Sequence, residues 1–198
     1  MTTIVAVRKN GIVTIAADTL TTFGNTRLPA MMDSSHDKVL RIGESFVGVC
    51  GSAAHHLVLA NLLGKTPDVQ LNSKEAIFET FRKLHPVLKE ECFLNPKEDE
   101  EDPYESSQIT ALIVNTSGLY GIFSMREVFE YTQFWAIGSG HEFALGAMQY
   151  AYSRLDNAAD IALAGVEAGI AFDKNSSAPI TLYSVNLITN NLVSVEAK

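Results

Sequence analysis

TTIVAVRKNGIVTIAAD, residues 2–18, contains two runs of alternating apolar residues on either side of Asn10-Gly11. Asn-Gly is the preferred pair for a two-residue type I′ turn, because both central residues must adopt a positive φ. The stretch therefore predicts a β-hairpin. Counting outward from the turn in antiparallel register places Thr3 opposite Asp18, so that a carboxylate returns beside the start of the chain.

The start of this hairpin carries a candidate nucleophile. If Met1 is removed, Thr2 has both a hydroxyl nucleophile and a free amine that can act as its base. The alternative is an ordinary edge hairpin with a frayed terminus, since chain ends are normally disordered. The hairpin alone favours the frayed terminus, so other parts of the chain must decide.

The composition is that of a globular protein, which we expect to form a single domain over residues 1–198. The chain is 46% hydrophobic, and its apolar runs are shorter than the roughly 18 residues that a membrane span needs. At this length neither a metal nor a disulfide is needed for stability. Cys50 and Cys92 lack the paired spacing of a zinc site, and no signal peptide is recognisable, so we expect a cytoplasmic location.

The net charge of −8 is concentrated in one segment. Residues 90–105 hold eight acidic side chains and only one basic residue, Lys97. The rest of the chain is nearly neutral and has no basic patch, which argues against a nucleic-acid partner. Pro96, Pro103 and the run of like charges oppose helix and sheet there.

The remaining pattern predicts blocks of strands and helices. A loop over residues 19–37 leads to a second hairpin around Gly43-Glu44, in which Ile42 faces Ser45 and Lys38 faces Val49. Helices are expected from Ser52 to Gly64 and from Ser73 to Pro86, where the proline kinks or ends the helix. Further strands are expected at 108–115, 119–124, 128–132, 134–137, 180–187 and 192–196, and further helices at 141–154 and 158–171. Such segregated blocks indicate an α+β fold, a four-layer αββα sandwich.

At this point the chain resembles the N-terminal nucleophile hydrolases of the proteasome β-subunit type, and within them the HslV-like peptidases and the betaproteobacterial proteasome homologues. The similarity runs nearly end to end and is carried by motifs in the same order: residues 2–8, Ala17-Asp18, 24–26, Lys38-Val39, 51–54, 137–140 and 173–176. The fold of that family is the αββα sandwich. This agrees with the order of elements expected above.

The resemblance implies a role for each matching residue. The family's nucleophile falls on Thr2, its orienting acid on Asp18 and its lysine on Lys38. The supporting serine falls on Ser139, and a second acid and serine fall on Asp173 and Ser176. The Gly51 amide matches the oxyanion-hole donor, Thr22 pairs with the substrate backbone, and Val49 lines the specificity pocket, which favours an uncharged side chain. No cofactor is required; backbone carbonyls of Ile170, Asp173 and Ser176 are a possible site for a structural cation.

The implied chemistry is physically consistent. Thr2 Oγ attacks a peptide carbonyl, its own amine accepts the proton, and water hydrolyses the acyl-enzyme. A free α-amine has a pKa near ~8, so about 1.4 kcal/mol is enough to make it neutral at pH 7. A cation at ~4 Å in an effective dielectric of ~20 contributes about 4 kcal/mol. Lys38, kept charged by Asp18, can therefore supply this effect, although a lone lysine at a strand end is ordinarily just solvated.

Several alternatives stay open at this stage. Ser139 between two glycines is also compatible with a tight turn, and the five histidines, His36, His55, His56, His85 and His141, lack ligand spacing and are expected at the surface or as caps. The acidic segment at 90–107 forms either a pore loop of a ring or a disordered outer loop. The resemblance implies self-association into a double ring of 12 or 14 subunits, peptide or protein substrates, and a possible AAA+ unfoldase partner. Two other functions are a ring subunit that does not cleave and an amidase for small amides.

Overall fold

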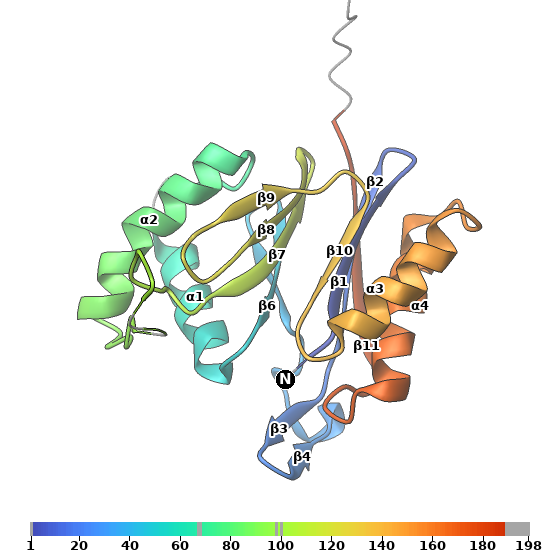
Figure 1. Cartoon of the computed structure of the whole chain (residues 1–198), viewed down its shortest axis with the longest axis horizontal. Helices are drawn as coiled ribbons and strands as arrows, with labels where there is room; N and C mark the ends of the chain where they lie inside the picture. The colour runs from blue at the N-terminus through green and yellow to red at the C-terminus, as the bar shows by residue number, and fades with distance from the viewer. Residues whose placement is uncertain (1, 67–68, 98, 100, 189–198) are drawn as a thin grey trace, which may run out of the picture.

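The chain forms four layers, two sheets between two pairs of helices (Figure 1). The computed structural model describes residues 2–66, 69–97, 99 and 101–188. One sheet has the order β10-β1-β2-β11, and the other has the order β5-β6-β7-β8-β9. The strands of the first are β1 (Ile4–Lys9), β2 (Ile12–Asp18), β10 (Phe134–Ile137) and β11 (Ile180–Asn186); those of the second are β5 (Val39–Ile42), β6 (Ser45–Cys50), β7 (Thr110–Asn115), β8 (Gly118–Ile122) and β9 (Val128–Glu130). The expected αββα sandwich is confirmed.

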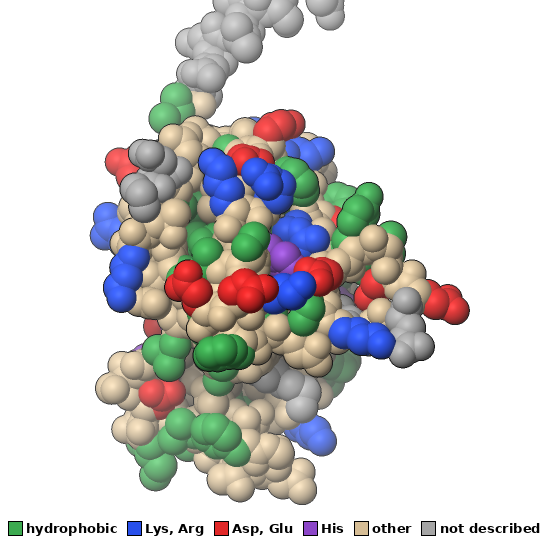
Figure 2. Space-filling view, turned by 90° about the vertical axis from the view of Figure 1, so that its left-hand side faces the viewer, with side chains coloured by type: hydrophobic (Ala, Val, Ile, Leu, Met, Phe, Trp, Pro, Cys, Tyr) green, Lys and Arg blue, Asp and Glu red, His purple; other side chains and the backbone are tan. Residues whose placement is uncertain are grey.

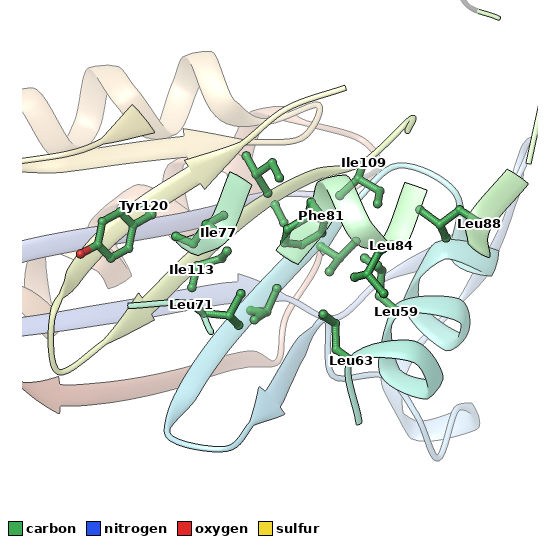
Figure 3. Packing of buried hydrophobic residues seen from close by; sticks show 14 residues of the cluster. Leu59, Leu63, Leu71, Ile77, Phe81, Leu84, Leu88, Ile109, Ile113 and Tyr120 are labelled. Atoms are coloured by element: carbon green, nitrogen blue, oxygen red, sulfur yellow. The ribbon is translucent and has the colours of Figure 1, made fainter. Parts of the chain in front are cut away.

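Each sheet is covered on its outer face by two helices (Figure 1). Helices α1 (Ala53–Lys65) and α2 (Lys74–Glu90) cover the five-stranded sheet, and α3 (His141–Tyr152) and α4 (Ala158–Phe172) cover the four-stranded sheet. Ser52 caps α1 by accepting from Ala54 N, at 3.3 Å, as expected at a helix start. The cluster beneath α2 is centred on Phe81, with Leu84 and Leu88 one and two turns further along (Figure 3).

The two sheets pack face to face through side chains of alternate residues on each strand. Ile4 and Ile15 contribute to this inner cluster, together with Leu112 of the other sheet. A Cβ added to Gly48 would lie 2.8 Å from Ile4 Cγ2 and 2.9 Å from Ile15 Cδ1. A glycine is therefore required in β6 at the point where it faces Ile4 and Ile15 of the other sheet. Because residues alternate, Val5 of β1 points to the opposite side and packs in the cluster under α3 and α4.

Both predicted hairpins have the predicted register. In the first, Lys9 pairs with Ile12, and Asp18 N donates to Thr3 O at 3.1 Å. Asn10 and Gly11 have φ of 51° and 76°, as a type I′ turn requires. In the second, Val49 N donates to Lys38 O at 3.1 Å. The register brings the starts of β1 and β5 and the end of β6 to one end of the sandwich.

Three expectations about the elements need correction or lie outside the structure. The segment 19–37 was predicted to be a loop, but it contains a short hairpin, β3 (Thr21–Phe23) and β4 (Thr26–Leu28), and a 3₁₀ turn at Ala30–Met32. Pro86 does not end α2, which continues to Glu90. Leu84 and Leu88, on either side of the proline, are buried and stabilise the helix there. The strand expected at 192–196 lies outside the described residues.

The acidic segment is attached to the fold at its C-terminal end. After α2, the described residues up to 109 form neither helix nor strand, as expected. Glu105 contacts His85 Nε2 at 3.1 Å and Lys89 Nζ at 2.6 Å, and its carbonyl accepts from Arg126 at 2.8 Å. On the face of the molecule drawn in Figure 2, acidic and basic side chains are interspersed. Whether this segment lines a pore stays a prediction. Within the described ranges, no helix is both long and apolar enough to cross a membrane.

Candidate active site

Thr2 is buried at the end of the sandwich, directly before β1. Only 4% of its surface is exposed, so this part of the chain is not a frayed terminus. Its N–H donates to Ser139 Oγ at 3.1 Å, and its carbonyl accepts from Gly140 N at 3.3 Å. A Cβ on Gly138 would lie 2.1 Å from Thr2 O, and Gly138 has φ of 91°. Gly138 therefore allows the 138–140 turn to approach the Thr2 backbone closely. A turn that served only to start α3 would not need this close approach.

Asp18 and Lys38 form a buried ion pair at the ends of β2 and β5. Asp18 Oδ1 accepts from Lys38 Nζ at 2.8 Å and from Thr3 N at 2.9 Å. Its Oδ2 accepts from Leu20 N at 3.0 Å and from Ser177 N at 3.1 Å. Asp18 is fully buried, so these four donors replace its hydration. The predicted pairing of the acid and the lysine is present.

Burial and the ion pair with Asp18 act on the pKa of Lys38 in opposite directions. Burial lowers the pKa of the Lys38 ammonium, and the neighbouring Asp18 carboxylate raises it through charge and hydrogen bonding. The burial effect is the larger, so the pKa of Lys38 lies below its ordinary value. Asp18 therefore limits, without cancelling, the tendency of this lysine to lose its proton.

Ser139, Asp173 and Ser176 form the second polar group at the start of the chain. Ser139 Oγ lies 2.6 Å from Asp173 Oδ2, and Ser176 Oγ lies 2.9 Å from the same oxygen. Asn175 donates to Asp173 Oδ1 from its backbone and its side chain. Burial raises the pKa of Asp173, but these four hydrogen bonds together outweigh it, so the pKa is lowered.

The lowered pKa of Asp173 favours its carboxylate form, and this form sets the direction of the hydrogen bonds. An ionised Asp173 only accepts, so the hydroxyl protons of Ser139 and Ser176 both point toward it. Ser139 Oγ is then left as an acceptor, which matches its contact with Thr2 N. An amine at Thr2 that donates one proton to Ser139 can direct its lone pair elsewhere. This polarity suits a terminal amine that acts as a base.

A pocket of about 330 Å³ opens at Thr2. Thr2 and Lys38 line it, together with the three residues predicted to contact a substrate, Thr22, Val49 and Gly51. Gly51 has φ of 111° and directly precedes the N-cap of α1. The positive end of the helix dipole therefore adds to the field at the position where an oxyanion would form.

Not all sequence-based expectations meet in this arrangement. Ile170 lies in the last turn of α4, and the Asp173 carbonyl accepts from Ser176 N at 3.0 Å; a cation there stays a prediction. Among the histidines, His36 Nδ1 lies 2.9 Å from Asp33 O and His141 Nδ1 lies 2.8 Å from Gly138 O. Both partners are carbonyl oxygens, so these contacts do not cap a helix N–H. His56 lines the pocket, and its Nε2 is a buried atom without a hydrogen-bond partner among the described residues.

Sequence reasoning did not assign Thr3 to the site. Its hydroxyl lies 2.7 Å from Ser176 Oγ, and its N–H donates to Asp18. A signal was available, because Thr3 has the same strand parity as Val5, which the alternation places toward the helices. A polar side chain on such a buried face needs a hydrogen-bond partner, but no local pattern identifies that partner.

Comparisons with known proteins agree with this geometry. The family model described as proteasome subunit matches residues 1–185. BPH of Thiobacillus denitrificans is 37% identical to this chain. The match to the structure of BPH covers 95% of this chain and 100% of the BPH chain, with a TM-score of 0.89. The match to the complex of BPH with epoxomicin covers 94% of this chain and 99% of the BPH chain, with a TM-score of 0.88. HslV from Trypanosoma brucei, at 22% identity, covers 93% of this chain and 99% of its own, with a TM-score of 0.67, and so shares the fold. No curated protein matches the chain.

Proposed function

Because the chain belongs to the proteasome subunit family, we propose that it is a threonine endopeptidase subunit whose nucleophile is Thr2 after removal of Met1. The observation that carries the proposal is the position of Thr2. It is buried, its nitrogen donates to Ser139, which in turn donates to Asp173, and it lines the same pocket as Lys38 and Gly51. The complex of the 37% identical BPH with epoxomicin is in keeping with it.

The proposed reaction uses the groups at this pocket in turn. Thr2 Oγ attacks the substrate carbonyl, and the proton passes to the Thr2 amine. The Gly51 amide, at the start of α1, stabilises the oxyanion. The protonated amine then gives its proton to the leaving amine, and a water molecule activated by the same base hydrolyses the ester. Thr22 pairs with the substrate backbone, and Val49, which lines the same pocket as Thr2, contacts the substrate side chain.

Two features support the Thr2 amine as the base. Lys38 lines the same pocket as Thr2, and a positive charge there disfavours a second positive charge on the amine. The Ser139 hydroxyl accepts one amine proton, because its own proton is directed to Asp173. The neutral amine is thus both favoured and oriented, with no metal or organic cofactor in the scheme.

We further propose that the protein works as a closed assembly of its own copies, a double ring of 12 or 14 subunits in the cytoplasm. Two separate groups of exposed apolar side chains support this. Phe143 and Phe172 contact each other on the outside of α3 and α4, while Phe23, Met31 and Met32 are exposed on the β3–β4 region. Two distinct apolar surfaces on one subunit suit two kinds of contact with neighbours. Proteins or peptides are the proposed substrates, and an AAA+ unfoldase is a possible partner.

The test is hydrolysis of fluorogenic tripeptides by protein purified from cells, with its N-terminus checked by intact mass. Wild type that starts at Thr2 should cleave, Thr2→Ser should retain part of the activity, and Thr2→Ala should have none. Activity that survives in Thr2→Ala would contradict the proposal. Absence of cleavage in correctly processed, assembled protein would favour a ring subunit that does not cleave, and turnover of small amides alone would favour an amidase.

A further inference from the structure

We infer that the Thr3 hydroxyl is a positioning group for Thr2, because it closes a ring of hydrogen bonds that begins and ends on the first two residues of the mature chain. From Thr2 N the contacts run to Ser139, to Asp173, to Ser176 and back to Thr3, at 3.1, 2.6, 2.9 and 2.7 Å. This inference rests on the proposed function of Thr2.

The direction of the last contact follows from the others. Ser176 has a single hydroxyl proton, which points to the ionised Asp173. Its oxygen is therefore the acceptor toward Thr3, and the Thr3 hydroxyl is the donor. The donors then lead to Asp173 along two paths, one from Thr2 N through Ser139 and one from the Thr3 hydroxyl through Ser176. Thr3 fixes the rotamer of Ser176, and through Asp173 the orientation of Ser139, the residue that accepts from Thr2 N.

The backbone around Thr3 is built to the shape of its side chain. Thr3 is fully buried. A Cβ on Gly140 would lie 2.0 Å from Thr3 Oγ1, and a Cβ on Gly169 would lie 2.4 Å from Oγ1 and 2.6 Å from Cγ2. Such distances are far below van der Waals contact, so only glycine fits at both positions while Thr3 keeps this rotamer. The side chain is thus held in one orientation by the 138–140 turn and by α4.

Thr3 also links the two halves of the site. Its N–H donates to Asp18 at 2.9 Å, on the oxygen that binds Lys38, while its hydroxyl belongs to the ring of Ser139, Asp173 and Ser176. A small displacement of Thr3 therefore moves Thr2 relative to both groups. Since catalytic rates depend steeply on such placement, the expected effect is on kcat more than on KM.

The test compares Thr3→Val, which keeps the shape and loses the hydroxyl, with Thr3→Ser, which keeps the hydroxyl. Thr14→Val is the matched control, because Thr14 is a fully buried strand threonine whose hydroxyl contacts Ser184 Oγ at 2.8 Å, away from the site. Thr3→Val should lower kcat for a fluorogenic tripeptide about tenfold with KM unchanged. Thr3→Ser and Thr14→Val should stay within about twofold of wild type.

Two further measurements keep the outcome unambiguous. The double variant Thr3→Val with Ser176→Ala should be no slower than Ser176→Ala alone, because both act through one contact. If Thr3→Val does not fold, Thr3→Cys, with only a weak donor, should show the same loss of kcat to a smaller extent. Wild-type kcat in the folded variant, or an equal loss in Thr14→Val, would overturn the inference. If wild type itself does not cleave, the proposed function has failed instead.

Discussion

At the scale of single residues, the Lys38–Asp18 pair links stability to activity. Its side chains are 12% and 0% exposed. Lys38→Met should leave Asp18 as a buried, unneutralised charge, and lower the free energy of unfolding by about 3 kcal/mol. It should also reduce peptide hydrolysis at least about 100-fold, because the amine of Thr2 loses its neighbouring cation. Urea unfolding and tripeptide kinetics measure the two effects.

An exposed lysine provides the control for this variant. Lys83 pairs with Glu79 at 3.7 Å on the surface of α2. Lys83→Met should change the free energy of unfolding by less than about 0.5 kcal/mol. Equal destabilisation in both variants would mean that the buried pair contributes no more than a surface pair.

The lowered pKa of Asp173 predicts how the free energy of unfolding depends on pH. Its pKa is lowered in the folded protein, because four hydrogen bonds to the carboxylate outweigh its burial. A depressed folded pKa stabilises the fold above the unfolded value of about 3.9, and this contribution is lost as pH falls through the folded pKa. The difference in unfolding free energy between wild type and Asp173→Asn should therefore be full at pH 6 and shrink below about pH 4. Urea titrations between these values measure it, with Glu101→Gln as an exposed control; a constant difference would contradict the account.

The residues of the site were only partly predictable from sequence. The first hairpin register returns Asp18 beside the start of the chain, whereas the roles of Thr2 and Lys38 follow from the resemblance to the proteasome β-subunits. Thr3 was missed, because its contacts with Ser176 and Gly169 join residues that are far apart in sequence, and no local pattern encodes such contacts. The alternation of faces along a strand predicts that this threonine is buried, but it does not predict the hydrogen-bond partner of its hydroxyl.

At the scale of elements, α4 packs through Gly169 against Thr3, the residue directly before β1. Gly169→Ala should gain about 1 kcal/mol of helix propensity but lose about 1–3 kcal/mol from the clash with Thr3, for a net loss of stability. Gly146 of α3 is the control, because an added Cβ there meets no atom within 4 Å among the described residues. Gly146→Ala should stabilise the protein by up to about 1 kcal/mol. Thermal unfolding compares them, and stabilisation by both would contradict this packing.

The elements that were predicted correctly are those with strong local signals. Asn10-Gly11 and Gly43-Glu44 determine the two main hairpins, and apolar spacing determines the four helices. The β3–β4 hairpin was missed, because its strands have only three residues each and show no clear alternation. The expectation that Pro86 ends a helix is wrong, because burial of the leucines around it outweighs the hydrogen bond that the proline removes.

At the scale of the whole molecule, the exposed aromatic pair on α3 and α4 tests the proposed assembly. Phe172 is 73% exposed and lies 5.5 Å from Phe143, between ring centroids. Phe172→Glu should place a charge in an apolar contact between subunits and shift the protein to smaller species in analytical ultracentrifugation. Phe93→Glu, at an exposed position after α2, is the control. A monomeric wild type, or no effect of Phe172→Glu on the assembly, would argue against this interface.

The acidic segment gives a separate prediction about access. If it lines a pore, deletion of residues 97–102 should change the hydrolysis of casein and of long or charged peptides, while cleavage of a tripeptide stays the same. Parallel assays of the two substrate classes measure this. Equal effects on both would show that the segment does not control entry.

The central claim is that Thr2 is an N-terminal nucleophile, and the most direct measurement is intact mass after incubation with an α′,β′-epoxyketone peptide. This reagent reacts with both the hydroxyl and the free amine of an N-terminal threonine. We predict one adduct per chain on protein that starts at Thr2, and none on protein that retains Met1 or carries Thr2→Ala. Absence of an adduct on folded protein that starts at Thr2 would contradict the account.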